Sequence, residues 1–220
     1  MSELLLLPFE KVADAPKRLS RVGIPYLHLC PFHYHAIEVK KWPPKGSTVV
    51  VTSARSFEFH SHPSYWQDRR LFVVGKGTEA AATSLGIMTE YVGHVGGALT
   101  VSVASKMTDD VIYHLGGMDI SAPLQKALNA VSHIRIPLYN RVRNDLFFTN
   151  QSSIKLSAIA SPAAAEAIGN HNIFSRSPCV CIGETTMDAA QNVGLEVIGQ
   201  AKLPRFSSLV EEAIIAYNRD

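Results

Sequence analysis

The sequence has little net charge and no long apolar run. Its 220 residues carry 21 Lys and Arg against 19 Asp and Glu, which leaves a net charge of +2. Basic residues are scattered, so the charge gives no argument for nucleic acid as a partner. No apolar stretch approaches the roughly 20 residues that a membrane helix needs. Residues 4–7 are all Leu but end at Pro8, so we expect a buried strand there and not a signal peptide or membrane segment.

Cysteine is scarce, and the number of cysteines is odd. Cys30, Cys179 and Cys181 are the only ones, and the last two alternate with Val180 and Ile182 as in a strand. No second pair of cysteines exists to complete a metal site of the C-x-C type. We therefore interpret these residues as small buried hydrophobes of a protein from the reducing cytoplasm.

Several catalytic motifs are missing. Residues 75–78 read Gly-Lys-Gly-Thr but lack the complete G-x-x-x-x-G-K-[ST] pattern, so nucleotide hydrolysis is excluded. No G-x-G-x-x-G follows the first expected strand, which argues against a dinucleotide site. No Ser-His-Asp or Cys-His arrangement for a nucleophile is present either.

Histidine is more frequent, with nine residues in the chain. The pairs His33 with His35 and His60 with His62 could each place two imidazoles on one face of an extended segment. Neither pair has a clear third ligand. Solvated loop histidines are the simpler interpretation, and we expect no metal site.

The strongest positive signal is an internal repeat. Thr52-Ser53-Ala54 follows an apolar run, and Ala160-Ser161-Pro162 follows another; Ser53 and Ser161 are 108 residues apart. Gly75 lies 22 residues after Ser53, and Gly183 lies 22 residues after Ser161. Gly86 and Gly194 keep the same offset. This register predicts two similar domains facing a common cleft, and such a cleft is the default place for a ligand.

The order of expected elements predicts parallel sheets. Strands are expected at residues 4–7, 26–30, 48–52, 71–74, 111–115, 156–159 and 179–182, and helices at 12–22, 54–59, 78–85, 121–130 and 209–217, with others after 161 and 183. Alternating strands and helices favour an α/β fold with two similar three-layer parallel-sheet domains, one of them discontinuous. We expect an outer domain over 1–35 plus 145–220, an inner domain over 41–133, and a two-stranded connector over 36–40 and 134–144.

Each copy of the repeat has two junctions where a strand leads into a helix through small or hydroxyl residues. Helix N-termini offer unpaired N–H groups and partial positive charge, so they bind carboxylates without Lys or Arg. Four such junctions across a cleft would suit a ligand with several carboxylates. The alternative is that these residues are only helix caps, as Ser161 before Pro162 and Thr185 before Asp188 would be.

With these motifs in this order, the chain resembles uroporphyrinogen-III synthase. The resemblance rests on Thr52-Ser53-Ala54, on a V-G-x-x-T turn at 74–78, on an I-G-x-T-T turn at 182–186, and on the Pro-x-Tyr segment that ends at Tyr139. It implies a cytoplasmic, monomeric enzyme without a cofactor. The implied substrate is hydroxymethylbilane, a linear tetrapyrrole with eight carboxylates, which is dehydrated and cyclised with inversion of the last ring, through a spirocyclic intermediate.

The resemblance also implies roles for particular residues. Tyr139 matches the tyrosine that assists departure of the substrate hydroxyl. The substrate-binding positions would be Thr52, Ser53, Ala54, Gly75, Thr78, Gly116, Ser161, Pro162, Gly183, Thr185 and Thr186. Hydroxymethylbilane synthase, which makes the substrate, is the candidate for a transient protein contact.

Three positions depart from the family pattern. Pro8 and the segment His114-Leu115-Gly116 stand where many members have an arginine, and Ala160 replaces a hydroxyl residue before Ser161. Two lost guanidiniums predict weaker carboxylate binding. The alternative function is a non-catalytic two-lobed binding protein for a small polycarboxylate, which would need the cleft but not Tyr139.

Overall fold

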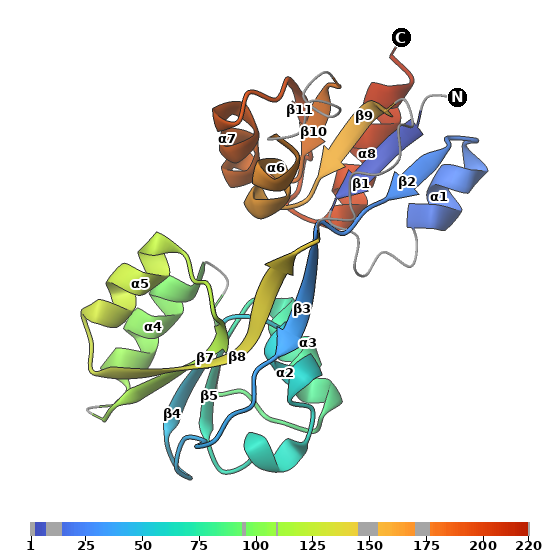
Figure 1. Cartoon of the computed structure of the whole chain (residues 1–220). Coiled ribbons are helices and arrows are strands. Elements are labelled where there is room, and N and C mark those ends of the chain that lie inside the picture. Colours follow the sequence, from blue (N-terminus) through green and yellow to red (C-terminus); the bar gives the residue numbers. More distant parts are fainter. Residues whose placement is uncertain are drawn as a thin grey trace. The chain divides into compact units, whose positions relative to one another are not determined.

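The chain forms two compact units. The computed structural model describes residues 3–7, 15–93, 96–108, 110–144, 154–169 and 177–219. Unit 1 combines Met1–His33 with Arg143–Asp220, and unit 2 is Tyr34–Val142. Each unit is an α/β structure built on a mostly parallel sheet, so the predicted fold class, including one discontinuous domain, is confirmed (Figure 1). The cleft that we expected between the two domains stays a prediction.

Unit 1 contains a five-stranded sheet with the order β11-β10-β9-β1-β2, and each of its neighbouring strands pairs in parallel. Its elements are β1 (Glu3–Leu7), α1 (Ala15–Arg21), β2 (Tyr26–His28), β9 (Ile154–Ile159), α6 (Pro162–Gly169), β10 (Cys179–Cys181), α7 (Glu184–Asn192), β11 (Val197–Gln200) and α8 (Phe206–Tyr217).

Helices cover both faces of this sheet. Leu4 and Leu6 of β1 pack in one apolar cluster with residues of α1 and α8, while Leu5 and Leu7 pack in a second cluster with residues of α6 and α7. A strand buried on both faces needs apolar residues at every position, which explains the uninterrupted leucines. Cys179 and Cys181 are buried in the second cluster, as predicted.

Unit 2 contains a six-stranded sheet with the order β3-β8-β7-β4-β5-β6. Its elements are β3 (Phe32–Ala36), β4 (Thr48–Val51), α2 (Arg55–Phe59), the 3-10 helix η1 (Pro63–Tyr65), β5 (Arg70–Val74), α3 (Lys76–Ser84), β6 (Tyr91–Gly93), α4 (Gly96–Lys106), β7 (Ile112–Gly117), α5 (Ala122–Asn129) and β8 (His133–Arg143).

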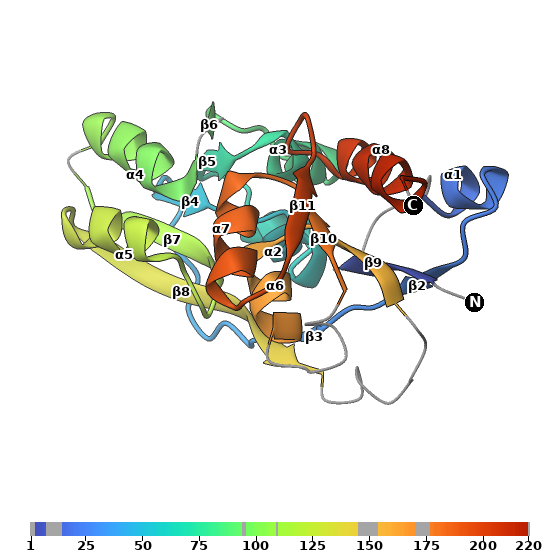
Figure 2. The same ribbon diagram turned by 90° about the horizontal axis from the view of Figure 1, so that it is seen from above.

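Unit 2 also has two apolar clusters, one on each face of its sheet. Val49 and Val51 of β4 pack with Phe57 of α2 and Ala82 of α3, whereas Val50 faces the opposite side and packs with residues of α4 and α5. Helices α4 and α5 lie side by side in both views (Figures 1 and 2). Both faces of the sheet are therefore covered, which gives a three-layer unit.

The sequence repeat corresponds to a structural repeat with exchanged parts. Elements β4 to α4 match β9 to α8 in order, and α3 and α7 begin at Lys76 and Glu184, 108 residues apart. The segment β1-α1-β2 occupies in its sheet the place that β7-α5-β8 occupies in the other. Unit 1 thus combines β1-α1-β2 of the first repeat with β9 to α8 of the second repeat. Unit 2 combines β4 to α4 of the first repeat with β7-α5-β8 of the second.

Several predicted boundaries were wrong. Strand β6 and helix α4 were not predicted, and Gly116 and Gly117 belong to strand β7 and not to a turn after it. Helix α3 begins at Lys76, two residues before the predicted start, because Gly75 is its N-cap. The first connecting strand is β3, which ends at Ala36, so residues 37–40 form no strand.

Candidate functional site

In unit 2, several of the predicted site residues lie close together where strands β4 and β7 end. These two strands are parallel neighbours, yet α2 leads from β4 toward β5 while α5 leads from β7 toward β8. A sheet at such a topological switch point places ligands beyond the carboxyl ends of the two strands. Thr52 follows β4, and Gly116 and Gly117 end β7, so predicted residues from distant parts of the sequence meet here.

Thr52 contacts a buried histidine at this edge. Its Oγ1 lies 3.2 Å from His114 Nε2. His114 is only 1% exposed, and burial, together with the nearby Arg135 and His133, lowers its pKa to about 4. The imidazole is therefore neutral at physiological pH, so it has one N–H donor and one nitrogen acceptor.

Glycines keep space around these side chains. A Cβ on Gly116 would lie 2.9 Å from Thr52 Oγ1, and a Cβ on Gly97 of α4 would lie 3.1 Å from Thr52 Cγ2. A Cβ on Gly117 would lie 3.1 Å from Cε2 and 3.3 Å from the hydroxyl oxygen of Tyr139. Gly116 and Gly117 thus leave room for Thr52 and for Tyr139.

A β-bulge directs Tyr139 toward this edge. Gly116 pairs with Pro137, but Gly117 pairs with Tyr139, so Leu138 is an extra residue on β8. Bulges of this kind commonly redirect a side chain next to an active site. The half-buried Tyr139 ring then lies over Gly117. The backbone carbonyl of Tyr139 accepts a hydrogen bond from the backbone N–H of Met118 at 2.8 Å.

An arginine and two further aromatic rings surround Tyr139. The rings of Tyr34 and Phe59 have centroids 6.0 Å and 5.7 Å from the Tyr139 ring. The guanidinium carbon of Arg55 lies 3.6 Å from the centroid of the Tyr34 ring, in a cation–π contact. Burial lowers the Arg55 pKa, while Glu58 and Tyr139 act in the opposite direction. Arg55 is a cation within electrostatic reach of the Tyr139 phenol.

The other predicted residues of unit 2 lie at the ends of β4 and β5. Ser53 was predicted to cap the next helix; its hydroxyl does accept from the backbone N–H of Arg55 at 3.2 Å, but the residue directly before α2 is Ala54. Gly75 has a φ of 79° and precedes α3. Thr78 is the third residue of that helix and only 5% exposed.

The equivalent residues of unit 1 lie at the ends of β9 and β10. Ser161 caps α6 as predicted, since its hydroxyl accepts from the backbone N–H of Ala164 at 3.2 Å, and Pro162 is the first residue of the helix. Thr185 is exposed, whereas Thr186 is 1% exposed. The capping box predicted for Thr185 is wrong, because the N-cap of α7 is Gly183, two residues earlier, and it provides no side-chain cap.

The departures from the family pattern have different outcomes. Ala160 holds the place that Thr52 holds in unit 2, and its N–H donates to Leu7 O at 2.5 Å. Unit 1 therefore lacks a hydroxyl at this position. His114 is buried behind Thr52 and does not replace an exposed guanidinium. Pro8 lies outside the described residues.

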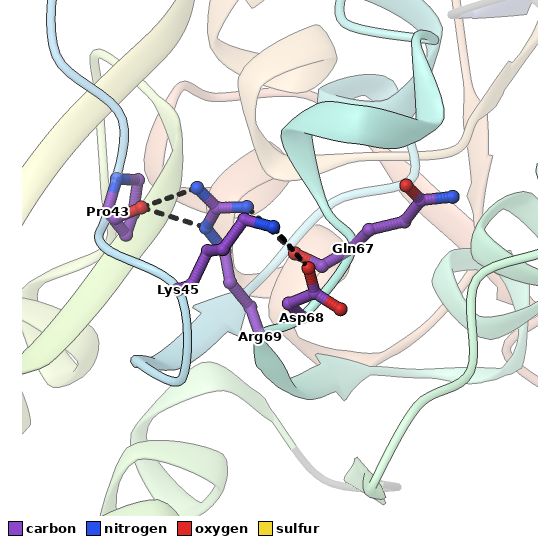
Figure 3. Close-up of polar contacts among 5 residues, drawn as sticks. All are labelled: Pro43, Lys45, Gln67, Asp68 and Arg69. Atoms are coloured by element: carbon purple, nitrogen blue, oxygen red, sulfur yellow. Dashed lines mark hydrogen bonds and ion pairs between the residues drawn. The ribbon is translucent and has the colours of Figure 1, made fainter.

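Unit 2 also has a pocket of about 520 Å³ at the opposite edge of its sheet, where β5 begins. Two arginines of its lining make internal contacts. Arg69 donates to Pro43 O through Nε at 2.9 Å and Nη2 at 2.5 Å, and to Gln67 O through Nη1 at 3.0 Å (Figure 3). Arg70 binds Glu90 and the carbonyl of Met107. These cations hold loops together, so we do not place the substrate in this pocket.

The histidine pairs do not assemble a metal site in the described part of the chain. No group of three or more His, Cys, Asp or Glu side chains there could hold a metal ion. His60 Nε2 lies 3.1 Å from Leu138 O, and His62 Nδ1 lies 2.7 Å from Ser64 Oγ. Among the described helices, none is long and apolar enough to cross a membrane.

The chain is similar in sequence to one protein family and in fold to solved structures. Residues 23–211 match the family model described as uroporphyrinogen-III synthase HemD. The fold is similar to uroporphyrinogen-III synthetase from Helicobacter pylori, with a TM-score of 0.73 and 15% identity over 98% of this chain and 100% of that one. It is also similar to a mutant uroporphyrinogen III synthase from the extremely thermophilic bacterium Thermus thermophilus, with a TM-score of 0.66 and 11% identity over the whole of both chains. No curated protein sequence matches this chain.

Proposed function

Because this chain belongs to the uroporphyrinogen-III synthase family, an enzyme family of tetrapyrrole biosynthesis, we propose that the cluster at the ends of β4, β7 and β8 acts on hydroxymethylbilane. The observation that carries this proposal is the convergence of Tyr139, Thr52 and Arg55 at the switch point of unit 2. A proton donor, a hydroxyl and a cation there match a substrate that loses a hydroxyl group and carries carboxylates.

Tyr139 is the proposed catalytic residue. The reaction breaks the bond between the terminal methylene carbon and its hydroxyl oxygen, and the oxygen leaves as water after taking up a proton. A phenol can supply this proton in the transition state. The methylene carbon, stabilised as a cation by its pyrrole, bonds to the α carbon of the last ring that already carries the old bridge, which gives the spirocyclic intermediate. The bond from this α carbon to the old bridge then breaks, and the freed bridge carbon bonds to the other α carbon of the same ring. Loss of the proton from that carbon restores the pyrrole and leaves the last ring inverted.

Most of the remaining rate would come from holding the flexible substrate in a reactive shape. Positioning can supply a large part of a reaction barrier when the reacting atoms are already activated. We assign this role to residues at or next to the carboxyl ends of the strands in both units, namely Thr52, Ser53, Ala54, Gly75, Thr78, Gly116, Ser161, Pro162, Gly183, Thr185 and Thr186. All except Pro162 have a backbone N–H, and Pro162 would contribute only shape. Arg55 would bind one carboxylate. Thr78 and Thr186 can act only in a locally opened conformation, because both side chains are buried and their backbone N–H groups donate to Gly75 O and Gly183 O at 3.1 Å.

We further propose a cytoplasmic monomer that works without a cofactor and receives its unstable substrate during transient contact with hydroxymethylbilane synthase. Gel filtration with light scattering would test the monomer. The contact would be tested by adding the synthase at increasing concentration and following how much substrate escapes into solution as type I product.

The activity itself is tested by a coupled assay. Hydroxymethylbilane is made in place by its synthase, this protein is added, and the oxidised products are separated as type I and type III isomers. We expect type III in excess over the type I isomer that forms spontaneously. Type I alone, from protein that is folded by circular dichroism, would overturn the proposed function.

A further inference from the structure

The pair formed by Thr52 and His114 lies on one face of the unit 2 sheet. Val50 pairs with His114 in the register of β4 and β7, so the two side chains point to the same face, the one covered by α4 and α5. Thr52, two residues after Val50, returns to that face beyond the end of the strand. This is how His114 Nε2 comes to lie 3.2 Å from Thr52 Oγ1.

The surroundings of the pair allow little freedom. His114 is almost fully buried. Gly97 and Gly116 border Thr52 so closely that a methyl group on either would contact it. Arg135, which pairs with His114 across β7 and β8, donates through Nη2 to the carbonyls of Gly117 and Met118 at 3.2 Å and 2.8 Å. Thr52 is thus bordered by Gly97, Gly116 and the imidazole, and the imidazole itself is enclosed.

We propose that His114 is a positioning residue, which donates its Nε2–H to Thr52 Oγ1 and thereby aims the Thr52 O–H at a carboxylate of the substrate. A threonine hydroxyl has one proton and two lone pairs. When it accepts from an imidazole, its own proton remains for an anionic acceptor, and a bond to a carboxylate is among the stronger hydrogen bonds. The inference rests on the proposed function, because it assigns a role to one of its binding residues.

The neutral state of the imidazole supports this assignment. A charged imidazole would need both nitrogens satisfied as donors, and burial beside Arg135 opposes that charge. At pH values well above 4 the ring stays neutral and can keep the Nε2–H form. His114 would therefore add no step to the pH profile in that range.

The first test is spectroscopic and does not depend on activity. In protein labelled with ¹⁵N at histidine, ring chemical shifts distinguish the Nε2–H from the Nδ1–H form. We expect His114 to be the Nε2–H form and to show no titration between about pH 5.5 and 8. An Nδ1–H form would overturn the proposal.

The second test is a double-mutant cycle in the coupled assay. We expect His114→Leu and Thr52→Val each to lower kcat/KM about tenfold, and the double variant to equal Thr52→Val alone. His114→Gln, whose amide can donate from near the Nε2 position, should recover activity to within about threefold of the wild type. His62→Gln changes an exposed histidine whose Nδ1 contacts Ser64 Oγ; it is the matched control and should keep wild-type activity.

The outcomes separate the two proposals. If the wild-type protein makes no type III product, the proposed function fails, whatever the state of His114. If the wild type is active but the two changes are additive, or folded His114→Leu is fully active, or folded His114→Gln is as impaired as His114→Leu, the positioning role is wrong and the proposed function remains.

Discussion

At the scale of single residues, the position of the Tyr139 ring depends on the absence of a side chain at residue 117. A Cβ there would lie 3.1 Å from Tyr139 Cε2, closer than most real contacts of this kind. We predict that Gly117→Ala shifts the ring and lowers the rate of type III formation several-fold, with little loss of folded protein. The double variant with Tyr139→Phe should be no slower than Tyr139→Phe alone. Additive losses would show that Gly117 acts on something other than Tyr139.

His114 also predicts how stability depends on pH. Its pKa is about 4 in the folded protein against 6.5 for an ordinary histidine. Between these values the unfolded chain binds more protons than the folded one, so stability falls as pH decreases from 6.5 to 4 and changes no further below that. The loss is at most about 3 kcal/mol. Urea unfolding at pH 7, 5 and 4 should show a smaller loss for His114→Leu than for the wild type. Equal losses in both proteins would contradict the assignment.

At the scale of elements, two equivalent helix starts differ in their need for glycine. Gly75 before α3 has φ 79° and ψ 153°, a conformation that side chains rarely adopt, while Gly183 before α7 has φ −175° and ψ 174°, which any residue adopts. A Cβ at either position meets no close contact. We predict that Gly75→Ala lowers the free energy of unfolding by about 1–3 kcal/mol, while Gly183→Ala changes it by less than about 0.5 kcal/mol. Thermal or urea unfolding of the two variants would measure this, and equal effects would be inconsistent with the strain argument.

The same helix starts show what the sequence could and could not predict. Continuous apolar runs predicted β1, β4 and β5 well, because strands buried on both faces leave no other pattern. Helix starts were predicted from hydroxyl residues, but α3 and α7 begin after glycines without a side-chain cap. Helix α4 was missed because Leu, Thr, Val, Ser and Val alternate there as in a strand; its packing on the sheet overrides that local pattern.

At the scale of the whole molecule, the exchanged repeats predict which fragments fold. Residues 32–143 hold all six strands of the unit 2 sheet, with helices on both faces. Residues 1–110 hold one full sequence repeat, but β1 lacks its neighbour β9 and β4 lacks its neighbour β7. We predict that the first fragment unfolds cooperatively in urea and that the second has no cooperative transition. The reverse result would mean that the repeats, and not the two units, are the independent folding bodies.

This exchange also explains why the candidate site was only partly predictable. The repeat identified the junctions at Thr52, Gly75, Ser161 and Gly183 as equivalent. It could not reveal that β7 lies beside β4, because that requires the order of strands in the sheet. The contact of Thr52 with His114 and the cluster of Arg55, Tyr34 and Phe59 around Tyr139 depend on that order and on the bulge in β8.

The most direct test of the account compares Tyr139→Phe with Tyr113→Phe in the coupled assay. Tyr113 is a half-buried tyrosine on the neighbouring strand β7, at the other end of the sheet, and serves as the matched control. Both variants lose only a phenol oxygen. We predict that Tyr139→Phe lowers the rate of type III formation by about tenfold to a hundredfold, since positioning groups remain, while Tyr113→Phe matches the wild type. An unchanged rate for folded Tyr139→Phe would remove Tyr139 from the chemistry, and a loss above about a thousandfold would contradict catalysis shared among many groups.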